Sequence, residues 1–203
     1  MSLDKYLIKD KKVVIATFNK GKVEEFKVLL SNYKLGILTP DKLGIGDVEE
    51  TGKSFTDNSV LKVKNIPSSY IAISDDSGLC IKNLDDNPGI FSARYAKKCG
   101  GWHNAMKKLF NESYKKNQQD FEAKFCCSLS IKFTDGKIFS YFGQVYGKII
   151  WPPRGNKGFG YDPFFIPKGQ NITYGEMDYS NKIQTDHRSV AFKKLAKAHL
   201  KNN

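Results

Sequence analysis

Apolar and polar residues in the first third of the chain alternate in blocks that predict strands and helices in succession. Residues 13–16 are all apolar and predict a buried strand, and apolar residues recur on one face of a predicted helix over 23–30. Residues 17–22, which are mostly polar, form the turn between them, so the N-terminal amides of the helix lie beside the end of the strand. Phosphates bind at that position in α/β proteins. Further predicted elements are strands over 35–38 and 70–74, a helix over 54–64 and a loop over 41–53.

The second half of the chain predicts one amphipathic helix and one long hairpin. Apolar residues recur at helical spacing between Trp102 and Phe110, and apolar residues alternate with mostly polar ones over 121–133, as in a half-buried strand. The sequence 134–136 is typical of a hairpin turn. A further strand is predicted over 138–142, and residues 145–150 either continue it or pair with it. A C-terminal helix over 192–199 and a mobile linker over 115–120 are also predicted. Alternating helices and strands with a long antiparallel hairpin indicate an α/β fold with a mixed sheet.

Composition limits the possible functions without choosing one. A chain of 203 residues, of which 40% are hydrophobic, is large enough for one packed core, so we expect residues 1–203 to form a single domain. The 33 Lys and Arg residues outnumber the 21 Asp and Glu residues, and the net charge of +12 attracts nucleic acid, acidic membranes or phosphorylated small molecules. The lysines are scattered from end to end, however, so a general compositional habit explains the charge at least as well.

The sequence carries no signal for export or membrane insertion. Residues 1–12 lack the apolar segment of a signal peptide, and no apolar run approaches the roughly 20 residues of a membrane span. The four cysteines form no CxxC pair and the three histidines offer no metal-binding spacing, so reduced cysteines in an intracellular compartment are the simplest account. We therefore expect a cytoplasmic protein without a membrane partner.

Two adjacent carboxylates follow the predicted strand 70–74, in the sequence Asp75-Asp76-Ser77-Gly78, which we interpret as a turn. The carboxylates repel each other unless a cation or hydrogen-bond donors neutralise them. Magnesium binds one or two carboxylates together with substrate phosphates, and a carboxylate beside it can activate water. The alternative is an ordinary solvent-exposed turn, which is common for Asp-Ser-Gly.

Two other segments carry residues suited to a phosphorylated ligand. Lys20 and Lys22 lie at the start of a predicted helix, where the positive end of the helix dipole disfavours them unless a phosphate binds. The acidic pair Glu49-Glu50 lies in the predicted loop 41–53 and could add carboxylate ligands to a metal. By itself, each segment is more often a solvated turn or loop.

The aromatic-glycine loop, residues 158–163, combines two glycines with Phe159 and Tyr161, whose rings offer flat faces on which a base can stack. Asp162 precedes a proline, which favours an extended backbone, and its carboxylate can accept hydrogen bonds from a base edge. The commoner alternative is a turn that packs its aromatic residues into a small core.

Taken together and in this order, these segments resemble the inosine triphosphatase family of purine nucleoside triphosphate pyrophosphatases. The matching segments extend from residue 13 to the last helix, and their agreement in order is far more specific than any one of them. They are Thr17-Phe18-Asn19-Lys20-Gly21-Lys22-Val23-Glu24-Glu25, Glu49-Glu50-Thr51-Gly52, Asp57-Asn58 with Leu61-Lys62, Asp75-Asp76-Ser77-Gly78-Leu79, Pro88-Gly89-Ile90-Phe91-Ser92-Ala93-Arg94-Tyr95, Gly158-Phe159-Gly160-Tyr161-Asp162-Pro163, and Lys182 with His187-Arg188.

The resemblance implies a fold and an activity. Family members have an elongated α/β fold, a mixed β-sheet flanked by helices, with two lobes and an active-site cleft between them, and they are commonly homodimers. The implied reaction is Mg2+-dependent hydrolysis of ITP, dITP or XTP to the monophosphate and pyrophosphate, which removes these nucleotides from the cellular pools. The partner is then a small-molecule nucleotide, with no stable nucleic acid partner. We expect water deprotonated by Asp76 to attack the α-phosphorus.

The resemblance also implies a role for each residue of the site. Asp76 is the implied general base and metal ligand, Asp75 supports it as a second catalytic residue, and Glu49 is the other implied metal ligand, with Glu50 beside it. Arg188 or backbone N–H groups would meet the 6-keto acceptor of the base, where adenine presents a donor. The implied substrate-binding residues are Thr17, Asn19, Lys20, Gly21, Lys22 and Lys62 for the triphosphate, Ser77 for the nucleotide, and Phe159, Gly160, Tyr161, Asp162, Lys182, His187 and Arg188 for the base.

Two residues depart from the family pattern. Phe18 stands where family members usually have glycine, and a positive φ at that position would strain it. Asp186 stands where serine commonly precedes His-Arg, and it either orients the guanidinium of Arg188 or weakens its pull on the base.

Two other functions remain open on the sequence alone. A basic nucleic-acid-binding domain would stack bases on Phe159 and Tyr161, but it would show a localised basic stripe. The scattered lysines and the acidic clusters argue against that reading. An enzyme-like fold with a structural or regulatory role is the third possibility, and only activity measurements separate it from an enzyme.

Overall fold

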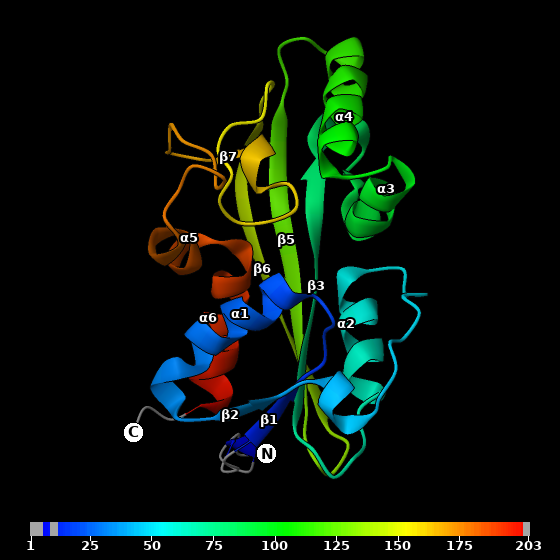
Figure 1. Cartoon of the computed structure of the whole chain (residues 1–203), viewed down its shortest axis with the longest axis vertical. Coiled ribbons are helices and arrows are strands. Elements are labelled where there is room, and N and C mark those ends of the chain that lie inside the picture. The colour runs from blue at the N-terminus through cyan, green and yellow to red at the C-terminus, as the bar shows by residue number, and fades with distance from the viewer. Residues whose placement is uncertain (1–5, 9–11, 201–203) are drawn as a thin grey trace. The chain divides into compact units, whose positions relative to one another are not determined.

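The computed structural model describes residues 6–8 and 12–200, and Figure 1 traces the chain through its helices and strands. Contacts within the chain divide it into two compact units. Unit 1 comprises Met1–Asp76, Cys127–Gly143 and Arg188–Asn203, and unit 2 comprises Ser77–Cys126 and Gln144–His187. The expectation that residues 1–203 act as one domain stays a prediction.

Unit 1 is built on parallel strands. β1 (Lys12–Ile15) lies between β2 (Gly36–Leu38) and β3 (Ala72–Ile81) and pairs in parallel with both. The register of β1 against β3 places Ile15 opposite Ile73. Because the two strands are parallel, the turn that follows β1 and the carboxylates of β3 lie at the same end of this pair.

Helices cover both faces of the strands in unit 1 (Figure 1). α1 (Lys20–Leu30) and α6 (His187–His199) pack against one face, and α2 (Phe55–Lys64) packs against the other. The odd-numbered apolar residues of β1 belong to the core under α1 and α6, and the even-numbered ones belong to the core under α2. This alternation follows from the period of two along a strand.

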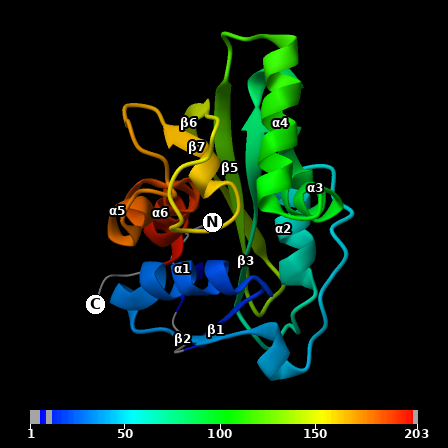
Figure 2. The same cartoon turned by 45° about the horizontal axis from the view of Figure 1, so that its top comes forward.

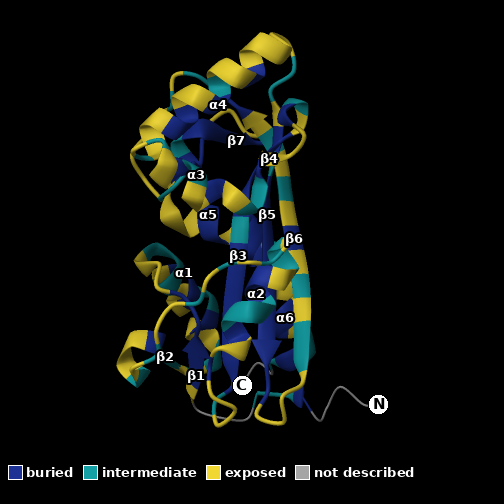
Figure 3. Cartoon of the chain, turned by 90° about the vertical axis from the view of Figure 1, so that its right-hand side faces the viewer, coloured by how far each residue is buried: buried dark blue, intermediate teal, exposed yellow. Residues whose placement is uncertain are grey.

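The strands of unit 2 are antiparallel. The last residues of β3 pair with β4 (Asn87–Pro88), and β6 (Ile138–Ile149) pairs with β7 (Phe165–Pro167). β5 (Glu122–Lys132) is bonded to β3 and β6, so the described strands follow the order β2-β1-β3-β5-β6-β7, with β4 beside β3. Figure 3 shows β3 and β5 almost entirely buried, whereas β6 alternates exposed with less exposed residues.

The helices of unit 2 are α3 (Ser92–Lys98), α4 (Trp102–Lys116) and α5 (Tyr179–Thr185). α3 and α4 contact each other and lie together in Figure 2. The core of this unit joins apolar residues of α4 to residues of β3 and β5 and to the aromatic residues around β7. Short 3-10 helices occur at Ser31–Tyr33, Pro40–Leu43, Lys82–Leu84, Gly89–Phe91 and Asp162–Phe164.

The structure confirms the predicted α/β class with a mixed sheet flanked by helices. The predicted helices over 23–30, 54–64 and 192–199 correspond to α1, α2 and α6, and the long hairpin corresponds to β5 and β6. The interpretation of residues 75–78 as a turn was wrong, because β3 continues without a break to Ile81. The sequence patterns did not predict α3 and α5. None of the helices in the described part of the chain has the length and hydropathy needed to cross a membrane.

Candidate active site

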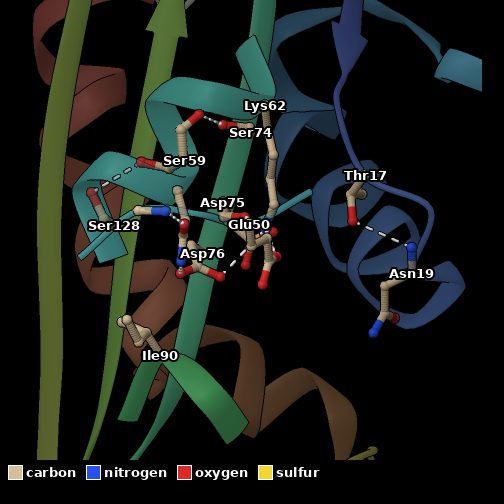
Figure 4. A network of polar contacts seen from close by, with 12 residues as sticks. Thr17, Asn19, Glu50, Ser59, Lys62, Ser74, Asp75, Asp76, Ile90 and Ser128 are labelled. Carbon is tan, nitrogen blue, oxygen red and sulfur yellow. Dashed lines mark hydrogen bonds and ion pairs between the residues drawn. The ribbon is translucent and has the colours of Figure 1, made fainter. Parts of the chain in front are cut away.

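The turn between β1 and α1 is organised by Asn19, which caps the helix. Its side-chain oxygen accepts a hydrogen bond from the backbone N–H of Lys22 at 3.2 Å, and its own N–H donates to Thr17 Oγ1 at 3.3 Å. Figure 4 shows Thr17 and Asn19 side by side in this turn. The cap fixes the direction in which the first N–H groups of α1 point.

The first turn of α1 is electrostatically unusual. It contains Lys20 and Lys22 and no acidic residue, although the positive end of a helix dipole favours acidic side chains. A bound phosphate reverses that disadvantage because both the dipole and the lysines attract it. This arrangement fits the predicted triphosphate cradle. Thr17 and Asn19 lie just before α1, Gly21 lies in its first turn, and Lys62, the other predicted member, lies on α2.

Asp75 and Asp76 are neighbours in an extended strand, so their side chains point to opposite faces of β3. The two carboxylates therefore do not face each other in one turn, as the sequence had suggested, and the repulsion expected from that arrangement is absent. Asp75 is fully buried and Asp76 is 4% exposed, and each carboxylate meets its own set of partners.

Asp75 is held by two cations. Lys22 Nζ lies 2.9 Å from Asp75 Oδ2, and Arg188 Nη2 donates to the same oxygen at 2.8 Å. Arg188 also pairs with Glu25 of α1, and all of these side chains except Lys22 are almost fully buried. Burial by itself raises the pKa of the Asp75 carboxyl, but the charges of Lys22 and Arg188 outweigh it and hold that pKa far below the usual value.

Asp76 faces α2 and the acidic loop, residues 49–52. Asn58 Nδ2 donates to Asp76 Oδ2 at 3.0 Å. Lys62 Nζ lies 3.3 Å from Asp76 Oδ1, and Figure 4 shows Lys62, Asp76 and Glu50 together. Asn58 and Lys62 are four residues apart on α2, so they project from the same side of the helix. Burial raises the pKa of Asp76, and it prevails over the opposing charges of Lys62 and Lys22. A carboxyl with a raised pKa is a stronger base than an exposed one.

Lys62 joins the two acidic segments. Its Nζ lies 2.5 Å from Glu50 Oε1 and also donates to the backbone carbonyl of Asp75 at 3.0 Å. Burial lowers the pKa of this ammonium, but the charges of Asp76, Asp75 and Glu50 outweigh it and raise the pKa. Lys62 is therefore charged at neutral pH and lies between two carboxylates.

The acidic loop places Glu50, rather than Glu49, against this group. The side chain of Glu49 is exposed, whereas Glu50 is partly buried and contacts Lys62. In the described part of the chain, no group of three or more His, Cys, Asp or Glu residues gathers into a metal cage. Glu50 and Asp76, which contact the same ammonium, fit a metal such as magnesium that takes one or two carboxylates and completes its shell with substrate phosphates.

Unit 2 contains the aromatic-glycine loop and Lys182. Asp162 Oδ2 accepts hydrogen bonds from the backbone N–H of Phe159 and from Lys182 Nζ, both at 2.8 Å. The ammonium of Lys182 also lies 4.8 Å from the centre of the Phe159 ring. Gly158 has a φ of +74°, and a Cβ there would lie 2.1 Å from Asp162 Oδ2, so the loop requires glycine at this position.

Two expectations about this loop were wrong. Asp162 is not extended, since it begins a 3-10 helix with Pro163 in its first turn. Tyr161 does not offer an open face, because it is 3% exposed, packs edge-on against Trp102 and donates its hydroxyl to the carbonyl of Ser92. For Tyr161 the core-packing alternative holds, and the nucleic-acid reading loses one of its two stacking rings. Phe159 is partly exposed.

The other predicted nucleotide-binding residues occupy different surroundings. His187 is buried and stacks on Phe125, with ring centres 4.8 Å apart, and Ser77 is partly exposed on β3. Arg188 belongs to unit 1, where it pairs with Asp75 and Glu25. The structure thus brings Arg188 together with the carboxylate of Asp75, and its predicted contact with a base stays a prediction.

The two departures from the family pattern have plain structural settings. Phe18 is 44% exposed and is not among the described residues with a positive φ, so the backbone strain considered for it does not arise. Asp186 is fully buried at the end of α5, where its N–H donates to the carbonyl of Lys182.

Sequence reasoning missed two residues that lie close to Asp75 and Asp76 in the structure. Glu25 is buried beside Arg188, and Asn58 is buried beside Asp76. Each belongs to a segment that carries the family resemblance, and each lies three or four residues from a lysine already assigned to the site. Helical spacing was therefore the signal that could have found them.

The sequence profile of the Ham1 family matches residues 13–198. The chain belongs to the Ham1 family. A protein of Zymomonas mobilis named dITP/XTP pyrophosphatase is 38% identical over 193 residues, covering 94% of this chain and 92% of that protein. A protein of Caulobacter vibrioides with the same name is 39% identical over 189 residues, covering 92% of this chain and 97% of that protein.

Solved structures of Ham1 proteins share this fold. A HAM1 protein from Coxiella burnetii superposes with a TM-score of 0.84 at 30% sequence identity and covers 93% of this chain and 98% of that one. The Ham1 protein of Staphylococcus aureus gives a TM-score of 0.80 at 34% identity and covers 92% of this chain and 97% of that one. The segments that resemble the inosine triphosphatase family therefore belong to a chain with the fold of Ham1 proteins.

Proposed function

We propose that this protein is a nucleoside triphosphate pyrophosphatase that hydrolyses ITP, dITP and XTP to the monophosphate and pyrophosphate in a magnesium-dependent reaction. The observation that carries the proposal is the group around Asp76, in which a buried carboxylate with a raised pKa contacts Lys62 and shares it with Glu50. Ham1 relatives named dITP/XTP pyrophosphatase support the choice of substrate.

Asp76 is the general base of the proposed reaction. Its carboxylate accepts a proton from water, which then attacks the α-phosphorus, and the pyrophosphate leaves. Burial and the bond from Asn58 hold the carboxylate in place, and its raised pKa makes it a better proton acceptor. Magnesium bound by Asp76 and Glu50 would polarise the phosphoryl oxygens and offset their charge. Glu49 is the alternative ligand, and its exposed side chain makes Glu50 the better choice.

The triphosphate is assigned to the turn that begins α1 and to Lys62. Lys20, Lys22 and the N-terminal amides of α1 supply positive charge that an anionic chain of phosphates neutralises. Charge spread over phosphoryl oxygens in the transition state is stabilised by such fixed cations, which is the main contribution in phosphoryl transfer. Asp75 supports the arrangement by anchoring Lys22.

The base is assigned to residues of unit 2. Phe159 offers a partly exposed ring, and Lys182 offers an ammonium that Asp162 holds in place. A donor of this kind meets the 6-keto oxygen of hypoxanthine or xanthine, whereas adenine presents an amino group there. Two donors that face each other without acceptors cost about 1–3 kcal/mol when buried. The family resemblance further assigns Ser77, Gly160, His187 and Arg188 to the nucleotide. The buried ring of Tyr161 supports the loop that carries Phe159 from within the core.

One assay tests the proposal. Purified protein is incubated with magnesium and, in separate reactions, with ITP, dITP, XTP, ATP or GTP, and the released pyrophosphate is measured. We expect turnover of the first three at least about 10-fold faster than turnover of ATP, a ratio within reach of a hydrogen-bonding site. EDTA abolishes the activity if the metal is required, and the Asp76→Asn variant measures any contaminating phosphatase. Equal rates on all five nucleotides would contradict the proposed substrate selectivity. A folded but inactive protein would contradict the proposed enzymatic activity.

We further propose that the protein is a homodimer, as the family resemblance implies, and that it acts in the cytoplasm. Light scattering coupled to size-exclusion chromatography measures the mass in solution directly. The mass of two chains is expected, and the mass of one chain at micromolar concentration contradicts the dimer.

A further inference from the structure

Asn58 lies between the two acidic segments and bonds to both. Its side chain is fully buried in the second turn of α2. Asn58 Nδ2 donates to Asp76 Oδ2 at 3.0 Å, and Asn58 Oδ1 accepts from the backbone N–H of Gly52 at 2.8 Å. The N–H of Gly52 can only donate, so the amide oxygen must face Gly52 and the amide nitrogen must face Asp76.

The bond from Asn58 determines how the carboxylate of Asp76 is turned. Because Oδ2 is occupied by the amide, Oδ1 is the oxygen that faces Lys62 Nζ, at 3.3 Å. The same Nζ contacts Glu50 Oε1. Without the amide, the carboxylate is free to rotate about its side-chain bonds, and the oxygen presented to Lys62 and Glu50 is no longer fixed.

The bond to Gly52 fastens the acidic loop to α2. A Cβ on Gly52 would lie 2.5 Å from Asn58 Oδ1, so the loop backbone rests directly on the amide. The next residue continues the attachment, since the N–H of Lys53 donates to Asp57 Oδ2 at 3.2 Å. Glu50 lies two residues before Gly52, so the position of its carboxylate depends on this attachment.

We propose that Asn58 is a positioning residue that holds Asp76 and the loop bearing Glu50 in fixed positions relative to each other. One amide group thereby controls the relative placement of the general base and its acidic neighbour, without touching the substrate. This inference rests on the proposed role of Asp76. Groups that orient metal ligands and bases in this way typically change activity or metal affinity by about 10- to 100-fold when they are removed.

Two substitutions separate the two bonds. Asn58→Asp keeps the size of the side chain and the acceptor for Gly52, but it removes the donor and sets a carboxylate oxygen against Asp76. Asn58→Leu has a similar volume and removes both bonds. Asn65→Asp is the matched control, because Asn65 caps the C-terminal end of the same helix and donates its Nδ2 to a loop carbonyl, that of Gly46, at 2.9 Å.

Turnover of ITP is the first measurement. We expect kcat to fall about 10- to 100-fold in Asn58→Asp and Asn58→Leu, with KM within about threefold of wild type. The reason is that the amide of Asn58 positions the general base Asp76 and does not bind the substrate. Asn65→Asp is expected to stay within about twofold of wild type. Urea unfolding of each variant identifies any that do not fold, and Asn58→Asp decides the outcome if Asn58→Leu is one of them.

Manganese without nucleotide is the second probe, followed by electron paramagnetic resonance of the free ion. Asn58→Leu is expected to bind manganese about 10-fold or more weakly than wild type, and Asn65→Asp is expected to bind it equally well. Wild-type kcat in folded Asn58→Asp, unchanged manganese binding in folded Asn58→Leu, or an equal loss in Asn65→Asp would each overturn the proposal.

The two probes distinguish this inference from the proposed function. If wild type fails to hydrolyse ITP, but Asn58→Leu binds manganese more weakly than wild type does, the proposed function is contradicted and the positioning role of Asn58 is retained. A wild-type protein that neither hydrolyses ITP nor binds manganese would overturn both.

Discussion

The two faces of β3 give neighbouring carboxylates opposite surroundings. On one face, Asp75 is fully buried and paired with Lys22 and Arg188, and its pKa lies far below the usual value. On the other face, Asp76 shares Lys62 with a second carboxylate and accepts a bond from a neutral amide, and its pKa is raised. Both side chains are buried, so the sign of the pKa shift depends on the number and closeness of the cations.

This difference separates an anchoring carboxylate from a reactive one. A carboxylate that two cations neutralise stays ionised over the accessible pH range and holds its partners in place. A carboxylate with a raised pKa that contacts one cation, and shares it with a second carboxylate, accepts a proton more readily. The alternation of side chains along an extended strand makes the separation possible within two consecutive residues. The comparison predicts that Asp76 matters for turnover and Asp75 for stability.

The largest expected effect is on turnover in Asp76→Asn. The amide has nearly the same shape but cannot accept the proton from water, so kcat for ITP should fall about 10²- to 10⁴-fold, the usual contribution of a general base. Pyrophosphate release gives the rate, and binding of the nucleotide should be largely retained. Turnover at the wild-type rate would show that Asp76 is not the general base, and the two faces of β3 would then not differ in function as proposed.

Asp75→Asn should lose stability. The substitution leaves Arg188 and Lys22 without their shared carboxylate, and breaking a buried ion pair on one side costs about 3–5 kcal/mol. Urea unfolding at pH 7 measures the free energy of unfolding, with Asp76→Asn as the control at the next position. If the control is destabilised as much as Asp75→Asn, the anchoring role does not belong to Asp75 alone.

Glu50→Gln and Glu49→Gln test which acidic residue belongs with Asp76. Of these two residues, Glu50 contacts Lys62, so Glu50→Gln should lower the activity at limiting magnesium by about 10- to 100-fold. Glu49, whose side chain is exposed, should tolerate the change with little loss. A magnesium titration of initial rates compares the two variants, and the reverse order would assign the ligand to Glu49, as the sequence first implied.

The smallest expected effect is a difference in acid stability. The pKa of Asp75 is lower in the folded protein than its ordinary value of 3.8, so the folded state binds this proton less readily than the unfolded state. The stabilisation it provides is present above the unfolded pKa and is lost as the pH falls towards the folded pKa. Between about pH 5 and about pH 3, a range that brackets the unfolded pKa of 3.8, wild type should lose more unfolding free energy than Asp75→Asn. Equal losses would mean that Asp75 is not strongly paired in solution.

The local patterns of the sequence predicted the elements that position the site. The apolar runs and the helical spacing located β1, α1 and α2, and the alternating residues located β5. Ser54 caps α2, where its hydroxyl accepts from the N–H of Asp57, and Asn19 caps α1. These features depend on residues close together in the sequence, so propensity and periodicity suffice to find them.

The sequence by itself therefore determined the α/β class, the strand-turn-helix unit with its lysines and the order of the acidic segments. Only the tertiary structure decided that residues 75–78 continue a strand, because pairing with neighbouring strands overrides the turn preference of Asp, Ser and Gly. It also decided that Glu50 rather than Glu49 reaches Lys62, and that Arg188 pairs with Asp75 from more than a hundred residues away. Such partners are set by packing between distant segments, and spacing along the chain carries no record of them.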